Sequence, residues 1–332
     1  MNIAIIGATG NVGRKILEVL EFKKLSIDKL YLVASSKSAG QQINFRGRDL
    51  EIFDLASFDF SNVQVSFFSA GGKISQQYAL KAAKHSIVID NSSFFRMDPE
   101  VPLIVPEVNP QDLKNHKKKN IIANANCSVI PLVVALKPLH DLYQINRIVV
   151  STYQSVSGAG KAPMDELLSQ TKEFYEKKKL RSKFFTKQIA FNAIPHIDSF
   201  LKDGYTKEEQ KMHDEVKKIL DKKIKITSTS VRIPVLVSHA LSVNVEFKTK
   251  HNLEEIKMVL SSSPGCKVVD ELNDGGYITP VEAENKYETF ISRIRDDNSQ
   301  INSINLWIVS DNLLKGAALN AVEIAEILIK DI

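Results

Sequence analysis

Cysteine, glycine and proline are all scarce in this chain, and each shortage excludes a class of protein. Two cysteines in 332 residues cannot build a disulfide framework, and a structural metal site would need more Cys and His at close spacing. With 14 Gly and 11 Pro, the chain is neither collagen-like nor a disordered low-complexity sequence. We therefore expect a globular protein with a hydrophobic interior and no bound metal.

Long hydrophobic runs and a strong excess of charge are also lacking. No apolar run reaches the roughly 20 residues of a membrane helix, and the sequence starts directly with a strand-like pattern. The net charge is only +5, and acidic residues interrupt the densest basic run, Lys172 to Lys183. A solvated helix face explains that run better than a nucleic-acid patch. We expect a cytoplasmic protein that binds neither membrane nor nucleic acid.

The hydrophobic pattern differs between two parts of the chain. Residues 1–126 alternate between apolar runs of strand length and helical runs, which is typical of a parallel sheet with right-handed crossovers. Residues 127–310 contain clustered β-rich runs with a few helices between them, which predicts a mixed sheet. We expect an α/β protein with a Rossmann-like first domain and an α+β second domain. A final helix within 311–332 is predicted to complete the first domain.

Gly7, Gly10 and Gly13 lie where the first predicted strand, Met1 to Ile6, runs into the first predicted helix. Missing side chains at such a turn let a pyrophosphate approach the backbone, and the helix N-terminus supplies positive potential. The spacing G-x-x-G-x-x-G is a variant of the commoner dinucleotide fingerprint. The alternative is a purely structural turn.

The end of the second predicted strand indicates which cofactor binds. An acidic residue there would bind a free ribose hydroxyl and repel a 2′-phosphate. The segment "ASSKSAG" instead offers Ser35, Ser36, Lys37 and Ser38 without a carboxylate. This composition favours NADP, and a polar surface turn is the alternative.

Cys127 is predicted to lie between the strand "NIIANA" and the helix "SVIPLVVALKPL". Free N–H groups at a helix N-terminus stabilise a thiolate, and the thiolate is the nucleophilic form. A buried inert cysteine is the usual alternative. A thiolate beside a nicotinamide can form a covalent adduct with an aldehyde or acyl group, so aldehyde or acyl-phosphate redox chemistry is expected.

Several motifs together resemble one enzyme family. "GATGNVG", "SSFFRMDPEVPLIVPEVN", "NCS", "YQSVSGAGK", "EEQK" and "RIPVLVSH" occur in the order found in aspartate-β-semialdehyde dehydrogenases, and the resemblance covers essentially the whole chain. It implies NADP-dependent interconversion of L-aspartate 4-semialdehyde with L-4-aspartyl phosphate, in the route through diaminopimelate to lysine and in methionine and threonine biosynthesis. It also implies a homodimer formed through the second domain, which is the catalytic domain, and an active site between the two domains of a subunit.

The resemblance also implies roles for individual residues. Cys127 resembles the nucleophile that forms an acyl thioester, Gln154 the residue that orients the acyl group, and His239 the acid/base residue. Arg232 and Glu208 resemble substrate-binding residues. The resemblance assigns phosphate binding to Arg96, Asn126 and Lys211. It assigns cofactor binding to Thr9, Gly10, Asn11, Val12, Lys37, Ser38, Ser157, Gly158 and Asn312. The glycine turn and the segment after the second predicted strand add Gly7, Gly13 and Ser35 to the expected cofactor contacts.

Two spacings add structural expectations. Arg232 and His239 are seven positions apart, which would place them on opposite faces of an unbroken strand. If both serve one site, the strand must break between them. Glu208 and Lys211 are three apart on a predicted helix and share a face, where an exposed ion pair is the simplest alternative. Cys266, in the loop "SSSPGCK", is expected to be structural.

The chain departs from the family pattern at Ala125, Val129 and Ser238, where Pro, Thr and Gly are common. These changes leave the nucleophile and its ionic partners intact. Two alternatives stay open: an N-acetyl-γ-glutamyl-phosphate reductase, which runs the same thiol chemistry, and a non-catalytic NADP-binding homologue.

Overall fold

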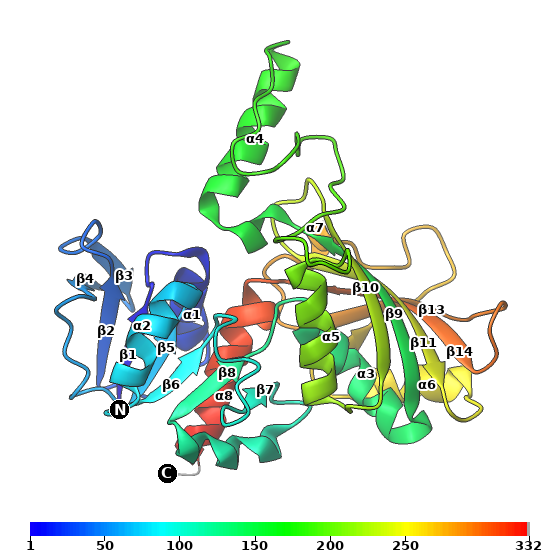
Figure 1. Cartoon of the computed structure of the whole chain (residues 1–332), viewed down its shortest axis with the longest axis horizontal. Coiled ribbons are helices and arrows are strands. Elements are labelled where there is room, and N and C mark those ends of the chain that lie inside the picture. The colour runs from blue at the N-terminus through cyan, green and yellow to red at the C-terminus, as the bar shows by residue number, and fades with distance from the viewer. Residues whose placement is uncertain (331–332) are drawn as a thin grey trace. The chain divides into compact units, whose positions relative to one another are not determined.

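The computed structural model describes residues 1–330, and the chain divides into two compact units (Figure 1). The first contains Met1–Asn126 and the C-terminal segment from Ala317 onward, and the second contains Cys127–Gly316. This division assigns Asp311–Gly316 to the second unit. Two residues of the predicted final segment, Asp331 and Ile332, lie outside the described residues.

The first unit is built on a mostly parallel sheet with the strand order β3-β4-β2-β1-β5-β6-β8-β7. Its strands are β1 (Asn2–Ile6), β2 (Lys29–Ala34), β3 (Gln42–Phe45), β4 (Arg48–Asp54), β5 (Val65–Phe68), β6 (Ile87–Asp90), β7 (Leu103–Ile104) and β8 (Ile121–Asn124). The central strands are buried along their length, as expected for a parallel sheet covered on both faces. The predicted Rossmann-like fold is confirmed. The β3–β4 hairpin was not predicted from the sequence.

Helices α1 (Asn11–Phe22), α2 (Gly72–Ala82) and α8 (Leu319–Lys330) complete this unit, together with a 3-10 segment at Pro110–Lys118. α8 packs against α1. Asn320 donates from Nδ2 to Asn124 Oδ1 (2.6 Å) and to the carbonyl of Ile104 (3.1 Å). These buried side-chain hydrogen bonds hold α8 to the ends of β7 and β8.

The second unit contains a six-stranded mixed sheet with the order β10-β9-β11-β14-β13-β12. Its strands are β9 (Ile145–Gln154), β10 (Lys225–Arg232), β11 (His239–Phe247), β12 (Cys266–Val268), β13 (Thr289–Asp296) and β14 (Ser303–Ser310). Its helices are α3 (Val129–Tyr143), α4 (Lys161–Tyr175), α5 (Lys207–Ile219), α6 (Leu253–Ser262) and α7 (Pro280–Ala283). The predicted mixed-sheet α+β architecture is confirmed.

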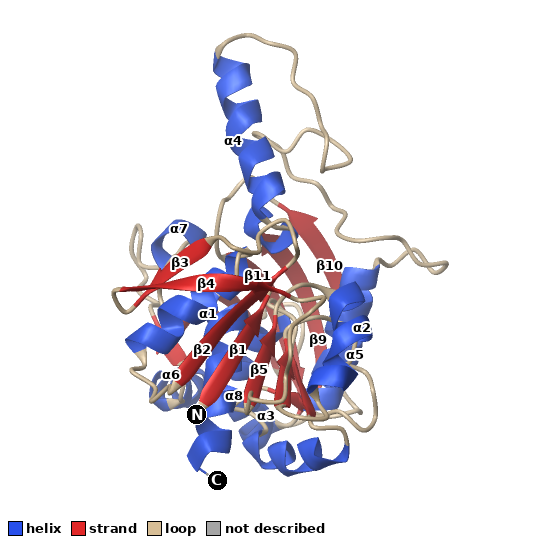
Figure 2. Ribbon diagram, turned by 90° about the vertical axis from the view of Figure 1, so that its left-hand side faces the viewer, coloured by secondary structure: helices blue, strands red, loops and turns tan. Residues whose placement is uncertain are grey.

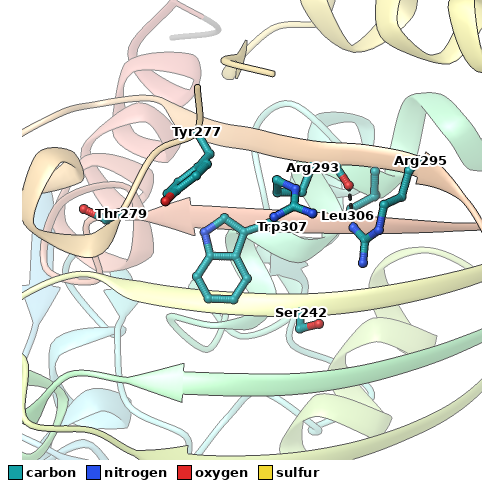
Figure 3. Close-up of a pocket in the computed structure, with 7 residues that line it drawn as sticks. All are labelled: Ser242, Tyr277, Thr279, Arg293, Arg295, Leu306 and Trp307. Atoms are coloured by element: carbon teal, nitrogen blue, oxygen red, sulfur yellow. Dashed lines mark hydrogen bonds between the residues drawn. The ribbon is translucent and has the colours of Figure 1, made fainter. Parts of the chain in front are cut away.

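Helices α3, α5 and α6 contact the strands of this sheet. Along β9, buried residues alternate with half-exposed or exposed ones, which is typical of a sheet with one face toward the core. On the other face, Trp307, Tyr277, Arg293 and Arg295 line a pocket (Figure 3). Among the described residues, no carboxylate forms an ion pair with either arginine.

α4 and the loop after it extend away from the sheet of the second unit (Figure 2). The segment "APMDELLSQTKEFYEKKK", residues 162–179, has a helical sequence pattern, but α4 ends at Tyr175. Lys177 has a φ of +54°, and Lys177 and Lys178 are exposed. A residue with this left-handed φ cannot continue a right-handed α-helix, so the helix has ended before it. Across the described part of the chain, no helix is long and apolar enough to cross a membrane.

Candidate active site

Three glycines shape the turn between β1 and α1. Gly7 has a φ of +88°, and a Cβ there would lie 3.0 Å from the backbone N of Ala70, just after β5. A Cβ at Gly13 would lie 2.2 Å from the carbonyl O of Gly7. The strand order reverses between β1 and β5, which is where sheets of this kind bind their ligands.

The N-terminus of α1 is open to an anion. Gly10 is its N-cap residue, and no side chain caps the first turn. Gly10 has no side chain that could accept a hydrogen bond from the first turn of the helix. Gly10 is exposed, and Thr9, Asn11 and Val12 are half-buried around it.

The predicted cofactor-selecting segment forms a turn directly after β2. Ser35, Ser36 and Lys37 are exposed, and the N–H of Ser38 donates to the carbonyl of Ser35 (2.9 Å). One carboxylate lies nearby that the sequence pattern did not reveal: Asp54 pairs with Ala34 across β4 and β2. The turn itself carries one cation and no acid.

Arg96 is buried in the first unit. Its Nε donates to the carbonyl of Asn124 (2.8 Å), and its Nη2 donates to the carbonyl of Asn91 (2.9 Å). The side chain is 7% exposed, and Asn126 is 5% exposed, so neither is an ordinary surface residue. A guanidinium held by backbone carbonyls retains its positive charge, which suits recognition of an anion.

Cys127 lies at the predicted strand-to-helix junction. β8 ends at Asn124, Ser128 is the N-cap residue of α3, and α3 begins at Val129. The residue is half-buried. A Cβ at Gly316 would lie 3.1 Å from both Cβ and the carbonyl O of Cys127, so the π-helical turn Leu314–Ala318 approaches the cysteine closely. A side chain at position 316 would require Cys127 to move by a few tenths of an ångström.

Gln154, Glu208 and Lys211 form one hydrogen-bonded group in the second unit. Gln154 Nε2 donates to Glu208 Oε1 (3.2 Å), and Lys211 Nζ donates to Glu208 Oε2 (3.0 Å). Glu208 is 6% exposed. The ion pair suggested by the i, i+3 spacing exists, but it is not the exposed pair of the simpler alternative.

Arg232 and His239 lie on different strands, so the required break is present. β10 ends at Arg232 and β11 begins at His239, and both strands flank β9. Both side chains border Gly158, where a Cβ would lie 3.2 Å from His239 Nε2 and 3.3 Å from Arg232 Nη1. The polar ends of both side chains therefore lie close together beside Gly158.

The hydrogen bonds of His239 fix which ring nitrogen carries the proton. The backbone N–H of Ser155 donates to Nδ1 (3.0 Å). Since an N–H group can only donate, Nδ1 is the acceptor and the neutral ring carries its proton on Nε2. Nε2 is buried and has no hydrogen-bond partner among the described residues.

Electrostatics keep the imidazole neutral. Full burial, together with the positive charge of Arg232, lowers the pKa of His239 to about 3. Burial also lowers the pKa of Arg232, although Glu208 and Cys127 oppose this shift. Arg232, Glu208, Cys127 and His239 are thus close enough for their charges to interact, and the second unit brings these four predicted residues together.

Asn312 connects the three segments around His239. Its Oδ1 accepts from Ser157 Oγ (3.1 Å), Ser155 Oγ (3.2 Å) and the N–H of Ser238 (2.8 Å). Its Nδ2 donates to Ser157 Oγ (3.0 Å). The predicted cofactor-binding role of Ser157 and Asn312 stays a prediction, and their side chains also fix the backbone beside His239.

Ser238 has a backbone conformation that suits glycine. Its φ is +74°, a left-handed conformation that is unfavourable for residues with a side chain. Its hydroxyl is buried without a hydrogen-bond partner among the described residues. Both features cost free energy in the folded state.

We therefore expect Ser238→Gly to raise the free energy of unfolding by about 1 kcal/mol, because the strain and the unpaired hydroxyl are removed while some chain entropy is lost. Urea denaturation measures this change. Ser242→Gly, in the extended backbone of β11, is the matched control and should destabilise the protein. A fall in stability for Ser238→Gly would show that φ at this position is not strained.

The sequence did not predict the residues that contribute to the site through the backbone or through a neighbouring side chain. The N–H of Ser155 and the close approach of Gly316 leave no side-chain signature. Asp198, which contacts Lys211, stands in an irregular loop with no periodicity. Among the described residues, no group of three or more His, Cys, Asp or Glu side chains is arranged to hold a metal ion.

The fold defines a two-unit protein with a dinucleotide-binding unit. Residues 2–116 match the family model described as "Semialdehyde dehydrogenase, NAD binding domain", and residues 136–315 match "Semialdehyde dehydrogenase, dimerisation domain". The chain therefore belongs to the semialdehyde dehydrogenase family.

Individual relatives are similar over their whole length. A protein of Rickettsia typhi named aspartate-semialdehyde dehydrogenase is 51% identical, with 99% of this chain and 98% of the relative covered. A protein of the same name from Aquifex aeolicus is 49% identical, again with 99% and 98% covered. The crystal structure of aspartate semialdehyde dehydrogenase II from Vibrio cholerae, complexed with ASA, superposes with a TM-score of 0.97 at 45% identity, covering 99% of this chain and 98% of that one. The resemblance predicted from the motifs is confirmed.

Proposed function

We propose that this protein is an aspartate-semialdehyde dehydrogenase that converts L-aspartate 4-semialdehyde, phosphate and NADP reversibly to L-4-aspartyl phosphate and NADPH. The observation that carries the proposal is the proximity of Cys127, Gln154, Glu208, Arg232 and His239 in the second unit of a chain whose relatives bear that name. The reaction would serve lysine, methionine and threonine biosynthesis.

Cys127 is the proposed nucleophile. Its thiolate would attack the aldehyde carbon and form a hemithioacetal, and the positive charge of Arg232 would favour the thiolate. Bound NADP supplies the hydride acceptor that allows this adduct to become a thioester. Attack of phosphate on the thioester carbon then breaks the C–S bond, releases the acyl phosphate and restores the thiol.

His239 is proposed to act from Nε2. With Nδ1 occupied by the Ser155 N–H, the neutral ring presents one N–H group to the oxygen of the adduct. Gln154 would orient the acyl group while its Nε2 is held by Glu208. Arg232 would bind the α-carboxylate of the substrate, and Glu208 would contact its amino group. Opposite charges suit both contacts.

Phosphate binding is proposed for Arg96, Asn126 and Lys211. Arg96 and Lys211 each carry a positive charge in a partly or largely buried setting, which strengthens attraction to an anion. Gly7, Thr9 to Gly13, Ser157, Gly158 and Asn312 are proposed cofactor contacts. The position of the glycine turn at the N-terminus of α1, where Gly10 provides no capping side chain, supports this role.

NADP is the proposed cofactor, because Ser35, Lys37 and Ser38 offer hydroxyl groups and a cation after β2. Family membership by itself supports a NAD(P)-binding unit without distinguishing the two cofactors. Asp54, beside the end of β2, is a carboxylate that could favour NAD if it faced the ribose. The cofactor comparison in the assay below tests this point.

We also propose that the chain forms a homodimer through the face of the six-stranded sheet that α3, α5 and α6 do not contact. The matching family model for residues 136–315 is described as a dimerisation domain. Trp307, Tyr277 and two arginines without carboxylate partners in the described chain line a pocket on this face (Figure 3). Aromatic residues and arginine are enriched at protein interfaces. The cytoplasmic location stays a prediction.

A purified-protein assay tests the proposed function. We expect reduction of NADP with aspartate 4-semialdehyde only when phosphate is present, and slower reduction of NAD. N-acetylglutamate semialdehyde should give no reaction, because its acetylated amine cannot carry the charge that Glu208 would bind. The reverse substrate preference would favour an N-acetyl-γ-glutamyl-phosphate reductase, and no reaction with either aldehyde would favour a non-catalytic homologue.

A further inference from the structure

The ammonium of Lys211 lies between two carboxylates. Its Nζ is 2.9 Å from Asp198 Oδ2 and 3.0 Å from Glu208 Oε2. Glu208 is one turn earlier on α5, whereas Asp198 comes from the loop before that helix. The Glu208 and Lys211 side chains are 8% and 26% exposed, and that of Asp198 is 37% exposed. Two negative charges therefore accompany one positive charge.

The backbone conformation and a hydrogen bond fix the position of the Asp198 side chain. Its φ is +68°, and the N–H of Ser199 donates to its Oδ1 (2.8 Å), which leaves Oδ2 directed at Lys211. The loop is fastened on both sides. Ile194 and Arg232 exchange backbone hydrogen bonds, and the N–H of Lys207 donates to the carbonyl of Ser199 (2.9 Å).

The electrostatics of the group agree with this geometry. Burial acts to lower the pKa of Lys211, but Glu208 and Asp198 together raise it above its ordinary value. Burial likewise opposes the shift at Asp198, yet Lys211 holds the pKa of that carboxyl below its ordinary value. Lys211 and Asp198 are therefore both charged near neutral pH. An ammonium has three donors, so one remains for a further anion.

We propose that Asp198 is a specificity-determining residue that competes with phosphate for Lys211 and so sets the affinity of the enzyme for inorganic phosphate. This inference rests on the proposed function, in which Lys211 binds phosphate. A phosphate that reaches Lys211 gains one cation but meets the negative charge of Asp198. It must either displace that carboxylate or bind against its repulsion.

Asp198→Asn removes the negative charge with little change of shape. Asparagine tolerates a positive φ as well as aspartate does, and its Oδ1 can still accept from the N–H of Ser199. Glu208 still anchors Lys211. We expect the KM for phosphate to fall, because a negative charge that repels phosphate is removed. The fall should be limited to about tenfold, because that charge is partly exposed and acts through a high effective dielectric constant. The kcat and the KM for aspartate 4-semialdehyde should stay within about twofold of wild type.

Asp203→Asn is the matched control. Asp203 is exposed on the same loop, and its Oδ1 accepts from the N–H of Tyr205 rather than from Lys211. It should leave the KM for phosphate unchanged. The proposal is overturned if Asp198→Asn leaves the KM for phosphate unchanged or raises it, or if Asp203→Asn lowers it equally.

A protein that is not an aspartate-semialdehyde dehydrogenase would give a result different from all of these. In that case the wild-type protein itself would not reduce NADP with aspartate 4-semialdehyde and phosphate. Titration of the same three proteins with inorganic phosphate, followed by 31P NMR, then still tests the inference. Tighter phosphate binding by the Asp198→Asn protein alone supports the role of Asp198, and equal binding by all three overturns it.

Discussion

Replacing Cys127 with serine is expected to lower kcat for aspartate 4-semialdehyde by about a thousandfold or more. A serine hydroxyl at this position has a much higher pKa than a thiol, and neither Arg232 nor the N-terminus of α3 can ionise it near neutral pH. The half-buried side chain differs by one atom, so folding should be unaffected. The measurement is phosphate-dependent NADPH formation at saturating substrate.

Cys266→Ser is the control for this substitution. Cys266 begins β12, and its Sγ donates to the carbonyl of Val134 (3.7 Å). We expect wild-type kcat for this variant. Retained turnover in the Cys127→Ser protein, or loss of turnover in the Cys266→Ser protein, would show that the nucleophile is assigned to the wrong cysteine.

Replacing His239 with asparagine is expected to lower kcat by about a hundredfold to ten-thousandfold, because the N–H group at the position of Nε2 is lost. The pH profile is the more specific measurement. Since the pKa of His239 is lowered to about 3, the imidazole is neutral at every pH above about 4. The wild-type profile of kcat should therefore show no imidazole titration between pH 5 and pH 8.

His213 provides the comparison for this prediction. Burial also lowers its pKa, and its Nε2 is 3.1 Å from Ser228 Oγ, so it is a half-buried histidine of the same unit. His213→Asn should leave kcat within about twofold. A wild-type profile with a limb near pH 6.5 that disappears in the His239→Asn protein would show that the pKa of His239 is not lowered.

The sequence predicted the elements that carry strong periodicity. The strands β1, β5, β6 and β8 are continuous apolar runs, and α1 repeats apolar residues at helical spacing, so local pattern and burial agree. The β3–β4 hairpin was missed because only short, largely exposed segments form it, and its pairing depends on contact with β2. Tertiary context decides such elements.

The site was predictable where a side chain carries the chemistry. The odd separation of Arg232 and His239 required a break in the strand, and the break is present. The burial of Glu208 was not predictable, because an i, i+3 Glu–Lys pair looks the same on an exposed helix. The N–H of Ser155 contacts His239 and the carboxylate of Asp198 contacts Lys211 only because the chain folds as it does. No sequence pattern predicts these contacts.

Mass spectrometry of the intact protein and its peptides tests most directly whether an acyl thioester forms on Cys127. The protein is mixed with aspartate 4-semialdehyde and NADP in the absence of phosphate, quenched with acid and digested. We predict one acyl group on the peptide that contains Cys127, formed together with one equivalent of NADPH, and its loss when phosphate is added before the quench. An unmodified Cys127 peptide after NADPH has formed, or an acyl group on Cys266, would contradict the proposed mechanism.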